Sequence, residues 1–147
     1  MTNIKFETSE QKLKKQDIFF INKLLRQLDK KNKNITEKRI ESIVKQRPLN
    51  EIVVARDKNG DICGMASLYI FHTLSAFKGV IEDVVVDEKH RGKGIGERLI
   101  HKLIDVAKEN GVQYIDLTSR PERKTASFYN GLGFKKRKTN VFRKESK

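Results

Sequence analysis

The sequence contains no tryptophan, one cysteine and two prolines, and its apolar runs are short. Cys63 has no second cysteine in the chain to pair with, so an internal disulfide is excluded. The lack of a disulfide favours a reducing, cytoplasmic setting. No run approaches the roughly 20 apolar residues of a membrane span, and residues 1–7 lack the apolar segment of a signal peptide. We therefore expect a cytoplasmic protein without a membrane partner, built as a single domain over residues 1–147.

Histidine and aromatic residues are also scarce. The three histidines, His72, His90 and His101, do not have the spacing of metal ligands, so we expect no metal. Aromatic residues make up 7% of the chain, which offers little support for a platform that stacks nucleic-acid bases.

Positive charge, in contrast, is abundant, with a formal net charge of +13. Residues 1–48 contain 13 Lys and Arg against 6 Asp and Glu, and residues 135–147 contain 7 against 1, whereas residues 49–134 are balanced. The excess indicates solubility and attraction for a polyanionic ligand. The alternative is a surface that faces nucleic acid or the ribosome, which we do not favour.

A glycine-rich stretch between an apolar run and an amphipathic run is the main functional signal. Residues 80–86 are rich in valine, residues 91–96 read Arg-Gly-Lys-Gly-Ile-Gly, and residues 97–110 have helical spacing. Glycines let main-chain N–H groups point at a ligand, and a helix N-terminus adds partial positive charge. This order of strand, turn and helix predicts a site for a phosphate-bearing ligand.

The order of residues in this stretch argues against two known kinds of phosphate-binding loop. A Walker A loop needs Ser or Thr after Gly-Lys, but Gly94 follows Lys93. A dinucleotide fingerprint needs its third glycine one residue later than Gly96, and it should open a βαβ unit rather than follow half of the chain. Both readings are therefore weak.

Two motifs together resemble the GCN5-related N-acetyltransferase (GNAT) superfamily. The first is Arg-x-x-Gly-x-Gly at residues 91–96, which resembles the loop that binds the pyrophosphate of coenzyme A. The second is Phe-Tyr-x-x-x-Gly-Phe at residues 128–134. The resemblance is strongest over residues 80–134, plausible from 50 to 142, and weak before residue 50.

The resemblance implies an α/β fold, with a mixed, mostly antiparallel sheet flanked by helices and two parallel central strands that splay apart. It also implies acetyl-CoA as cosubstrate. The pyrophosphate would bind Arg91, Gly92, Lys93, Gly94, Ile95 and Gly96. The pantetheine arm would pair with the backbone of Val84, Val85 and Val86.

Two residues are candidates for catalysis, and four are candidates for contact with the acceptor. Tyr129 matches the superfamily tyrosine that protonates the departing thiolate and contacts the cofactor; its alternative role is packing beside Phe128. Glu82 lies on an apolar strand beside the loop and could act as a base. We expect Glu82, Asp83, His72 and Thr118 to contact the acceptor, although a solvated acid or a structural histidine is the alternative for each of the first three.

Residues 81–83, Ile-Glu-Asp, also resemble the same strand in glucosamine-phosphate N-acetyltransferases, where the acids lie in the amino-sugar site. Many other members have an acid nearby, so the acceptor stays open. One departure concerns the cofactor: relatives often have asparagine seven residues before the tyrosine, and this chain has Glu122.

We therefore predict an acetyltransferase that moves the acetyl group directly to a primary amine of a small molecule or peptide. One alternative is a macromolecular amine, on a ribosomal protein N-terminus, a lysine or an aminoacyl-tRNA. Another is a non-catalytic module that binds CoA or nucleic acid. A homodimer is allowed by the sequence but not indicated by it.

Hydrophobic periodicity predicts the surrounding elements. Helices are expected over 17–30, from an Asn34–Glu37 capping pair to Pro48, over 97–110 before Gly111, and over 122–130. Strands are expected over 4–6, 52–55, 62–71, 80–86 and 112–118, with an Asn-Gly hairpin turn at 59–60 and a terminal hairpin over 134–143.

Overall fold

The computed structural model describes residues 3–9, 13–47 and 49–147, and its contacts divide the chain into two units, Met1–Leu117 and Thr118–Lys147. Each unit is described by itself, and a single domain over residues 1–147 stays a prediction.

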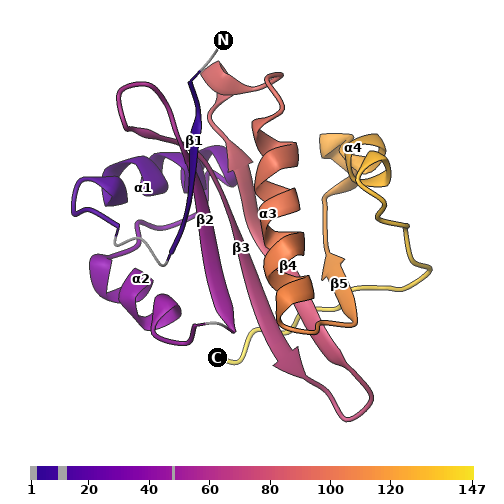
Figure 1. Cartoon of the computed structure of the whole chain (residues 1–147). Helices are drawn as coiled ribbons and strands as arrows, with labels where there is room; N and C mark the ends of the chain where they lie inside the picture. Colours follow the sequence, from indigo (N-terminus) through magenta and orange to yellow (C-terminus); the bar gives the residue numbers. More distant parts are fainter. Residues whose placement is uncertain (1–2, 10–12, 48) are drawn as a thin grey trace. The chain divides into compact units, whose positions relative to one another are not determined.

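The first unit contains a five-stranded mixed sheet, coloured indigo to orange along the chain in Figure 1. Its strands follow the order of the sequence and are β1 (Lys5–Thr8), β2 (Asn50–Arg56), β3 (Ile62–His72), β4 (Phe77–Val86) and β5 (Tyr114–Leu117). Neighbours from β1 to β4 are antiparallel, and β4 pairs with β5 in parallel. The predicted α/β fold with a mixed, mostly antiparallel sheet is confirmed.

The turn between β2 and β3 is the predicted Asn-Gly turn. Gly60 has a φ of 83°, a conformation that glycine adopts without a steric penalty, and its N–H donates to the carbonyl of Asp57 at 3.0 Å. This turn sets the β2–β3 register, in which Val54 lies opposite Met65.

Helices cover both faces of the sheet (Figure 1). Helix α3 (Ile95–Glu109) packs against one face, where Gly64 permits close approach: a Cβ there would lie 3.1 Å from Ile95 Cγ2. Helices α1 (Asp17–Leu28) and α2 (Glu37–Val44) pack on the other face. They form a core cluster with strand residues; its buried members are Ile21, Leu24, Ile40, Val54, Ile62, Met65 and Val85. Among the described residues, no helix has the length and apolarity of a membrane span.

Helix α2 begins with a different cap from the one predicted. Thr36 is the N-cap, and its hydroxyl accepts from the backbone N–H of Arg39 at 3.3 Å. Asn34 instead accepts a hydrogen bond from Arg26 of α1, so the predicted Asn34–Glu37 capping pair is wrong. The predicted stop at Pro48 lies outside the described residues.

The second unit has little regular structure. A 3₁₀ turn, η2 (Pro121–Arg123), precedes the short helix α4 (Ala126–Gly131). Lys124 separates them because its φ of 52° is incompatible with a continuous helix, so the helix predicted over 122–130 is divided.

The predicted terminal hairpin is also wrong, since residues 132–147 contain no strand. Val141 and Phe142, the apolar residues near the end of the predicted hairpin, are 78% and 89% exposed. The physical reason lies in the sequence Lys-Lys-Arg-Lys at 135–138, which offers like charges rather than alternating apolar side chains for burial.

Candidate active site

The loop between β4 and α3 has the conformation of an anion-binding turn. Gly92 and Gly94 both have a φ of 74°, and Gly94 is the N-cap of α3. The first N–H groups of the helix, from Ile95 onward, therefore lack intrahelical acceptors and carry partial positive charge. Arg91 and Lys93 are exposed beside them. The loop can bind a phosphate group through its backbone and its two cations.

Hydrogen bonds fix this loop to the sheet. The Nε of Arg91 donates to the carbonyl of Val86 at 2.9 Å, and the N–H of Asp87 donates to the carbonyl of Cys63 at 2.8 Å. Burial also makes Cys63 a core residue rather than a nucleophile, because it raises the pKa of this thiol to about 11.

Asp87 connects the same loop to α1. Its carboxylate accepts from the N–H of Lys89 at 2.9 Å and from Nε2 of Gln27 at 3.2 Å, and lies 3.1 Å from Nζ of Lys23. Gln27 also accepts from the N–H of Glu88 at 3.0 Å. Burial alone would raise the pKa of Asp87, but these partners outweigh it and lower the pKa to about 2. The loop is thus held by a charged carboxylate at neutral pH.

Strand β4 extends beyond its parallel partner. The β4–β5 pairing ends at Ile81 and Leu117, whereas β4 continues to Val86. On its other side β4 stays paired with β3, where Val85 lies opposite Met65 and Val86 opposite Gly64. The segment proposed to pair with pantetheine, Val84 to Val86, therefore lies past the end of the parallel ladder.

A bulge interrupts β4 at the predicted acidic pair. Ser67 pairs with Glu82 and Met65 with Val85, so three steps along β4 match two along β3. The extra residue is accommodated at Asp83, whose φ is 54°. Glu82 is exposed, whereas Asp83 is half-buried. The bulge thus separates the two acids into different environments.

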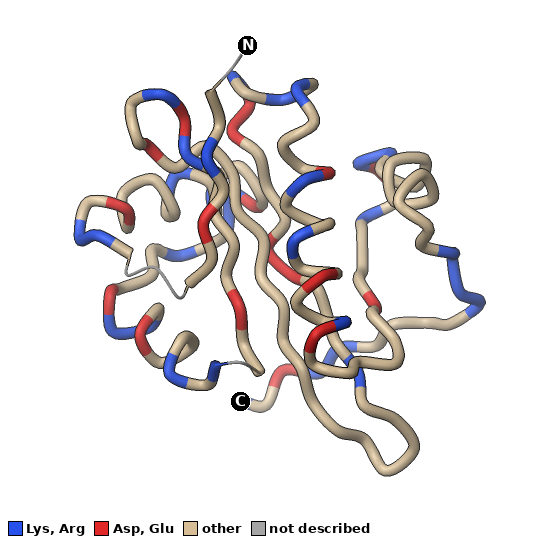
Figure 2. The backbone as a smooth tube through the Cα atoms, viewed as in Figure 1, with Lys and Arg blue, Asp and Glu red and all other residues tan. Residues whose placement is uncertain are grey.

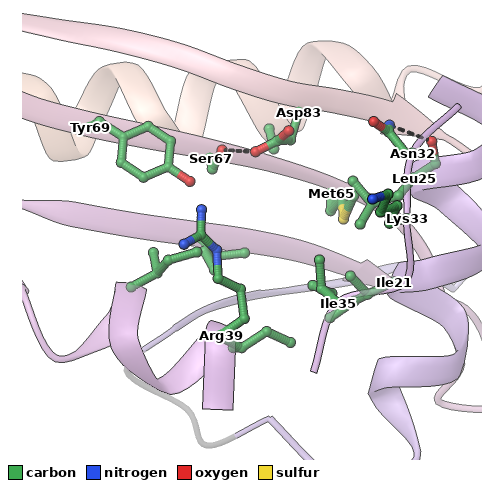
Figure 3. A pocket seen from close by; sticks show the side chains of 14 residues that line it. Ile21, Leu25, Asn32, Lys33, Ile35, Arg39, Met65, Ser67, Tyr69 and Asp83 are labelled. Atoms are coloured by element: carbon green, nitrogen blue, oxygen red, sulfur yellow. Dashed lines mark hydrogen bonds between the residues drawn. The ribbon is translucent and has the colours of Figure 1, made fainter. Parts of the chain in front are cut away.

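Asp83 lines a pocket of about 250 Å³ between the sheet and the α1–α2 segment (Figure 3). Most of the lining is aliphatic and comes from α1, α2, β2 and β3. The polar lining residues are Asn32, Lys33, Arg39, Ser67, Tyr69 and Asp83. The pocket therefore combines apolar walls with a few charged and hydroxyl groups, which is typical of a site for a small molecule.

Three polar residues meet on the sheet side of the pocket. The hydroxyl of Ser67 donates to Oδ2 of Asp83 at 2.8 Å. Burial raises the pKa of the nearby Tyr69, while a hydrogen bond to Ser67 and the charge of Arg39 act in the opposite direction. Figure 3 shows the guanidinium of Arg39 extending from α2 toward Tyr69.

The structure separates His72 from this group. His72 ends β3, stacks on Phe77 with ring centroids 4.1 Å apart, and is exposed. It lies five residues along the strand from Ser67, or roughly 17 Å at strand spacing. His72 therefore has a stacking role at the hairpin end and does not line the pocket. Within the described residues, no group of three or more His, Cys, Asp and Glu could hold a metal ion.

The remaining predicted residues belong to the second unit. Thr118 is exposed at its start. Tyr129 lies on α4 with its ring 5.0 Å from that of Phe128 and 6.1 Å from that of Phe134, both edge-on. Burial raises the pKa of the Tyr129 phenol, and the charge of Arg123 opposes the rise. The phenol consequently keeps its proton at neutral pH.

Sequence reasoning missed Arg39, Ser67 and Tyr69. A signal existed for the two strand residues: Met65, Ser67 and Tyr69 alternate along β3, so two polar side chains share a face of an otherwise apolar strand. Arg39 offered no such signal, because it is one of many cations in the first 48 residues.

Comparison with known proteins identifies the family. The model of the acetyltransferase (GNAT) family matches residues 20–134. This match covers most of the chain and includes both the loop and the Phe-Tyr motif. The chain therefore belongs to the GNAT acetyltransferase family, and the resemblance drawn from its two motifs is confirmed.

Individual relatives agree with this assignment. Glucosamine 6-phosphate N-acetyltransferase of Trypanosoma brucei brucei is 38% identical over 86 residues, which are 56% of this chain and 57% of that protein. The L-amino acid N-acyltransferase MnaT of Escherichia coli is 31% identical over 56% of this chain and 49% of its own length. The chain thus spans about half the length of these curated relatives.

A solved structure extends the likeness over the whole fold. Glucosamine-6-phosphate N-acetyltransferase from Arabidopsis thaliana superposes with a TM-score of 0.77 at 27% identity, covering 95% of this chain and 98% of that one.

Proposed function

We propose that this chain is an enzyme that transfers the acetyl group of acetyl-CoA to the primary amine of a small molecule. The observation that supports the proposal is the arrangement at the end of β4. A loop with two left-handed glycines connects this strand to α3, and the bulge within the strand turns Asp83 into a pocket. Family membership supports the reaction, and the names of the relatives support small-molecule amines as acceptors.

The cofactor would bind along the loop and the free part of β4. A Cβ built at Gly92 or Gly94 meets no atom within 4 Å, so the space above these residues is open to a ligand. This fits a pyrophosphate bound by residues 91–96. The backbone of Val84 to Val86 would hold the pantetheine arm.

The acceptor would enter the pocket beside Asp83. Its neutral amine nitrogen attacks the thioester carbonyl carbon, the C–S bond breaks, the amine loses a proton and the thiolate gains one. We assign amine binding and proton acceptance to Asp83 rather than to the predicted Glu82, because only Asp83 lines the pocket. Tyr129 is our candidate for the proton donor to the thiolate.

A macromolecular acceptor is the second candidate, supported by the exposed basic stretch after α4. Acetylation of a ribosomal protein N-terminus, a lysine or an aminoacyl-tRNA would use that charge where the acceptor belongs to an acidic macromolecule or to its complex with RNA.

The test is release of free CoA thiol from acetyl-CoA in the presence of a panel of amines, with mass spectrometry of the product. We expect one class of small primary amine to be acetylated in proportion to the thiol released. Binding of CoA without acetylation of any amine would contradict the proposal and favour a non-catalytic CoA-binding module.

A further inference from the structure

We infer that the acceptor carries an anionic group as well as its amine, with the anion bound at Arg39 and the amine at Asp83. The inference rests on the proposed function and narrows its acceptor to one chemical class.

The first argument is the placement of charge in the pocket. Asp83 projects from the bulge on the sheet side, next to Ser67. Arg39 enters from α2 on the opposite wall, and Lys33 comes from the segment between α1 and α2 (Figure 3). A molecule in the pocket therefore meets a carboxylate on the sheet wall and a guanidinium on the α2 wall, with Lys33 to one side.

The second argument is the pairing of these charges. Within the part of the chain that the structure describes, neither Arg39 nor Lys33 forms an ion pair with a carboxylate. Arg56 offers a contrast, because its guanidinium is held by Glu7 at 2.7 Å and Asp17 at 2.8 Å and serves the fold. The pocket cations thus keep their hydrogen-bonding capacity for a ligand.

The third argument is chemical fit. A guanidinium presents a planar fork of donors that matches a carboxylate or phosphate group. Ile35, Ile40 and Met65 line the space around the charged groups and suit the hydrocarbon part of a ligand. The volume of about 250 Å³ lies below the roughly 300–1,000 Å³ of sites for drug-sized ligands, which favours a small acceptor.

The same charges disfavour another class of amine. A polyamine would place its additional ammonium groups near Arg39 and Lys33, and only Asp83 among the pocket-lining residues would offset the repulsion. The pocket therefore selects an amine with an anion rather than an amine with further cations.

Matched acceptors test the inference. Glucosamine 6-phosphate is compared with glucosamine, and leucine with leucinol, because each pair differs in the anion and keeps the amine. In one of the two pairs, we expect kcat/KM to be at least about tenfold higher for the anionic member. The pair that shows this preference identifies the anion as a phosphate or as a carboxylate. Equal values, or higher values for both neutral members, would overturn the inference while leaving acetyl transfer to amines intact.

Two variants of α2 test whether the preference for an anionic acceptor depends on Arg39. Arg39→Gln should lower kcat/KM for the preferred anionic acceptor by on the order of 10–100-fold, the usual value of a charge-assisted hydrogen bond, and leave the neutral analogue nearly unchanged. Lys38→Gln removes a neighbouring exposed cation that does not line the pocket and should have no such effect. Equal losses in both variants would indicate general attraction and overturn the role of Arg39. Thiol release from no amine would overturn the inference together with the proposed function.

Discussion

Asp83 adopts a left-handed backbone conformation that costs a non-glycine residue roughly 1–2 kcal/mol. Asparagine and aspartate tolerate this conformation better than most residues. Strained residues of this kind concentrate at functional sites. Asp83→Asn should therefore preserve the bulge while it removes the negative charge that lines the pocket.

We expect Asp83→Asn to lower kcat/KM for the amine by about 10²-fold or more, the usual contribution of a positioned acid or base. Steady-state kinetics and the melting temperature, measured on one preparation, would check this. Glu82→Gln, examined in parallel, decides between the two carboxylates. A larger loss in that variant would restore Glu82 as the base and contradict our assignment.

Tyr129→Phe removes one hydroxyl and keeps the ring contacts with Phe128 and Phe134. If the phenol protonates the leaving thiolate, kcat should fall toward the lower end of the 10²–10⁴-fold range of general-acid effects. The KM for acetyl-CoA should hardly change, because the lost interaction forms in the transition state. An unchanged kcat with a lower melting temperature would make Tyr129 a packing residue.

At the scale of elements, the turn that opens α3 gives a prediction about CoA. Gly94→Val introduces a β-branched residue at a φ of 74° and fills the open space above the loop. The protein should fold but lose CoA binding in calorimetry. Lys93→Ala is the comparison, with only a modest loss of affinity, since it removes one exposed charge. Undiminished CoA affinity in Gly94→Val would contradict the loop assignment.

Arg56 ties β1, α1 and β2 together through Glu7 and Asp17. Burial alone would raise the pKa of Asp17, but the hydrogen bonds from Arg56 outweigh it, so the pKa lies below its ordinary value of 3.8. Arg56→Met would leave this carboxylate buried and unpaired, which typically costs about 3–5 kcal/mol. Urea unfolding at pH 7 should show that loss.

The pH dependence of this network has a definite sign. A lowered folded-state pKa gives stability above pH 3.8 that is lost as the pH falls. In Arg56→Met, burial without a cationic partner should raise the pKa of Asp17, so the difference in stability from the wild type should narrow as the pH falls from 7 toward 4 and continue to narrow below pH 3.8, where the wild type loses its own contribution. A difference that stays constant from pH 7 to pH 4 would show that lost packing, not charge, causes the effect.

Local patterns predicted the elements that depend on local chemistry. The spacing of Leu99, Ile100 and Leu103 predicts α3, and the Asn-Gly pair predicts the β2–β3 turn. The glycines of residues 91–96 indicate the loop for the same reason. Each of these signals lies within a few consecutive residues.

Features that depend on pairing across the chain could not be predicted in this way. The bulge at Asp83 exists because of the register with β3, which strand alternation within β4 does not contain. The role of Arg39 in the pocket requires α2 to be placed against the sheet. The N-cap of α2 depends on which polar residue the preceding turn places at the start of the helix. Asn34 is not available for this role, because its side chain accepts a hydrogen bond from Arg26.

For the whole molecule, the distribution of charge decides between kinds of acceptor. Figure 2 shows a continuous run of Lys and Arg after α4, and residues 135–147 carry 7 basic residues against 1 acidic. Removal of residues 143–147, which carry three of these seven basic residues, should leave kcat/KM for a small amine within a few-fold if their charge serves solubility. A steep rise in KM for a polyanionic acceptor, with weaker salt dependence, would support the macromolecular alternative.

The bulge in β4 has a consequence for how this protein can vary in length. If one residue between Glu82 and Val85 were deleted, two steps along β4 would match two along β3, so Val85 would stay opposite Met65 in the core while the left-handed position that turns Asp83 into the pocket would be lost. The connection at 73–76 has exposed backbone and no such constraint. Related chains are therefore free to lengthen or shorten that hairpin, whereas a deletion at the bulge would remove the position from which Asp83 lines the pocket.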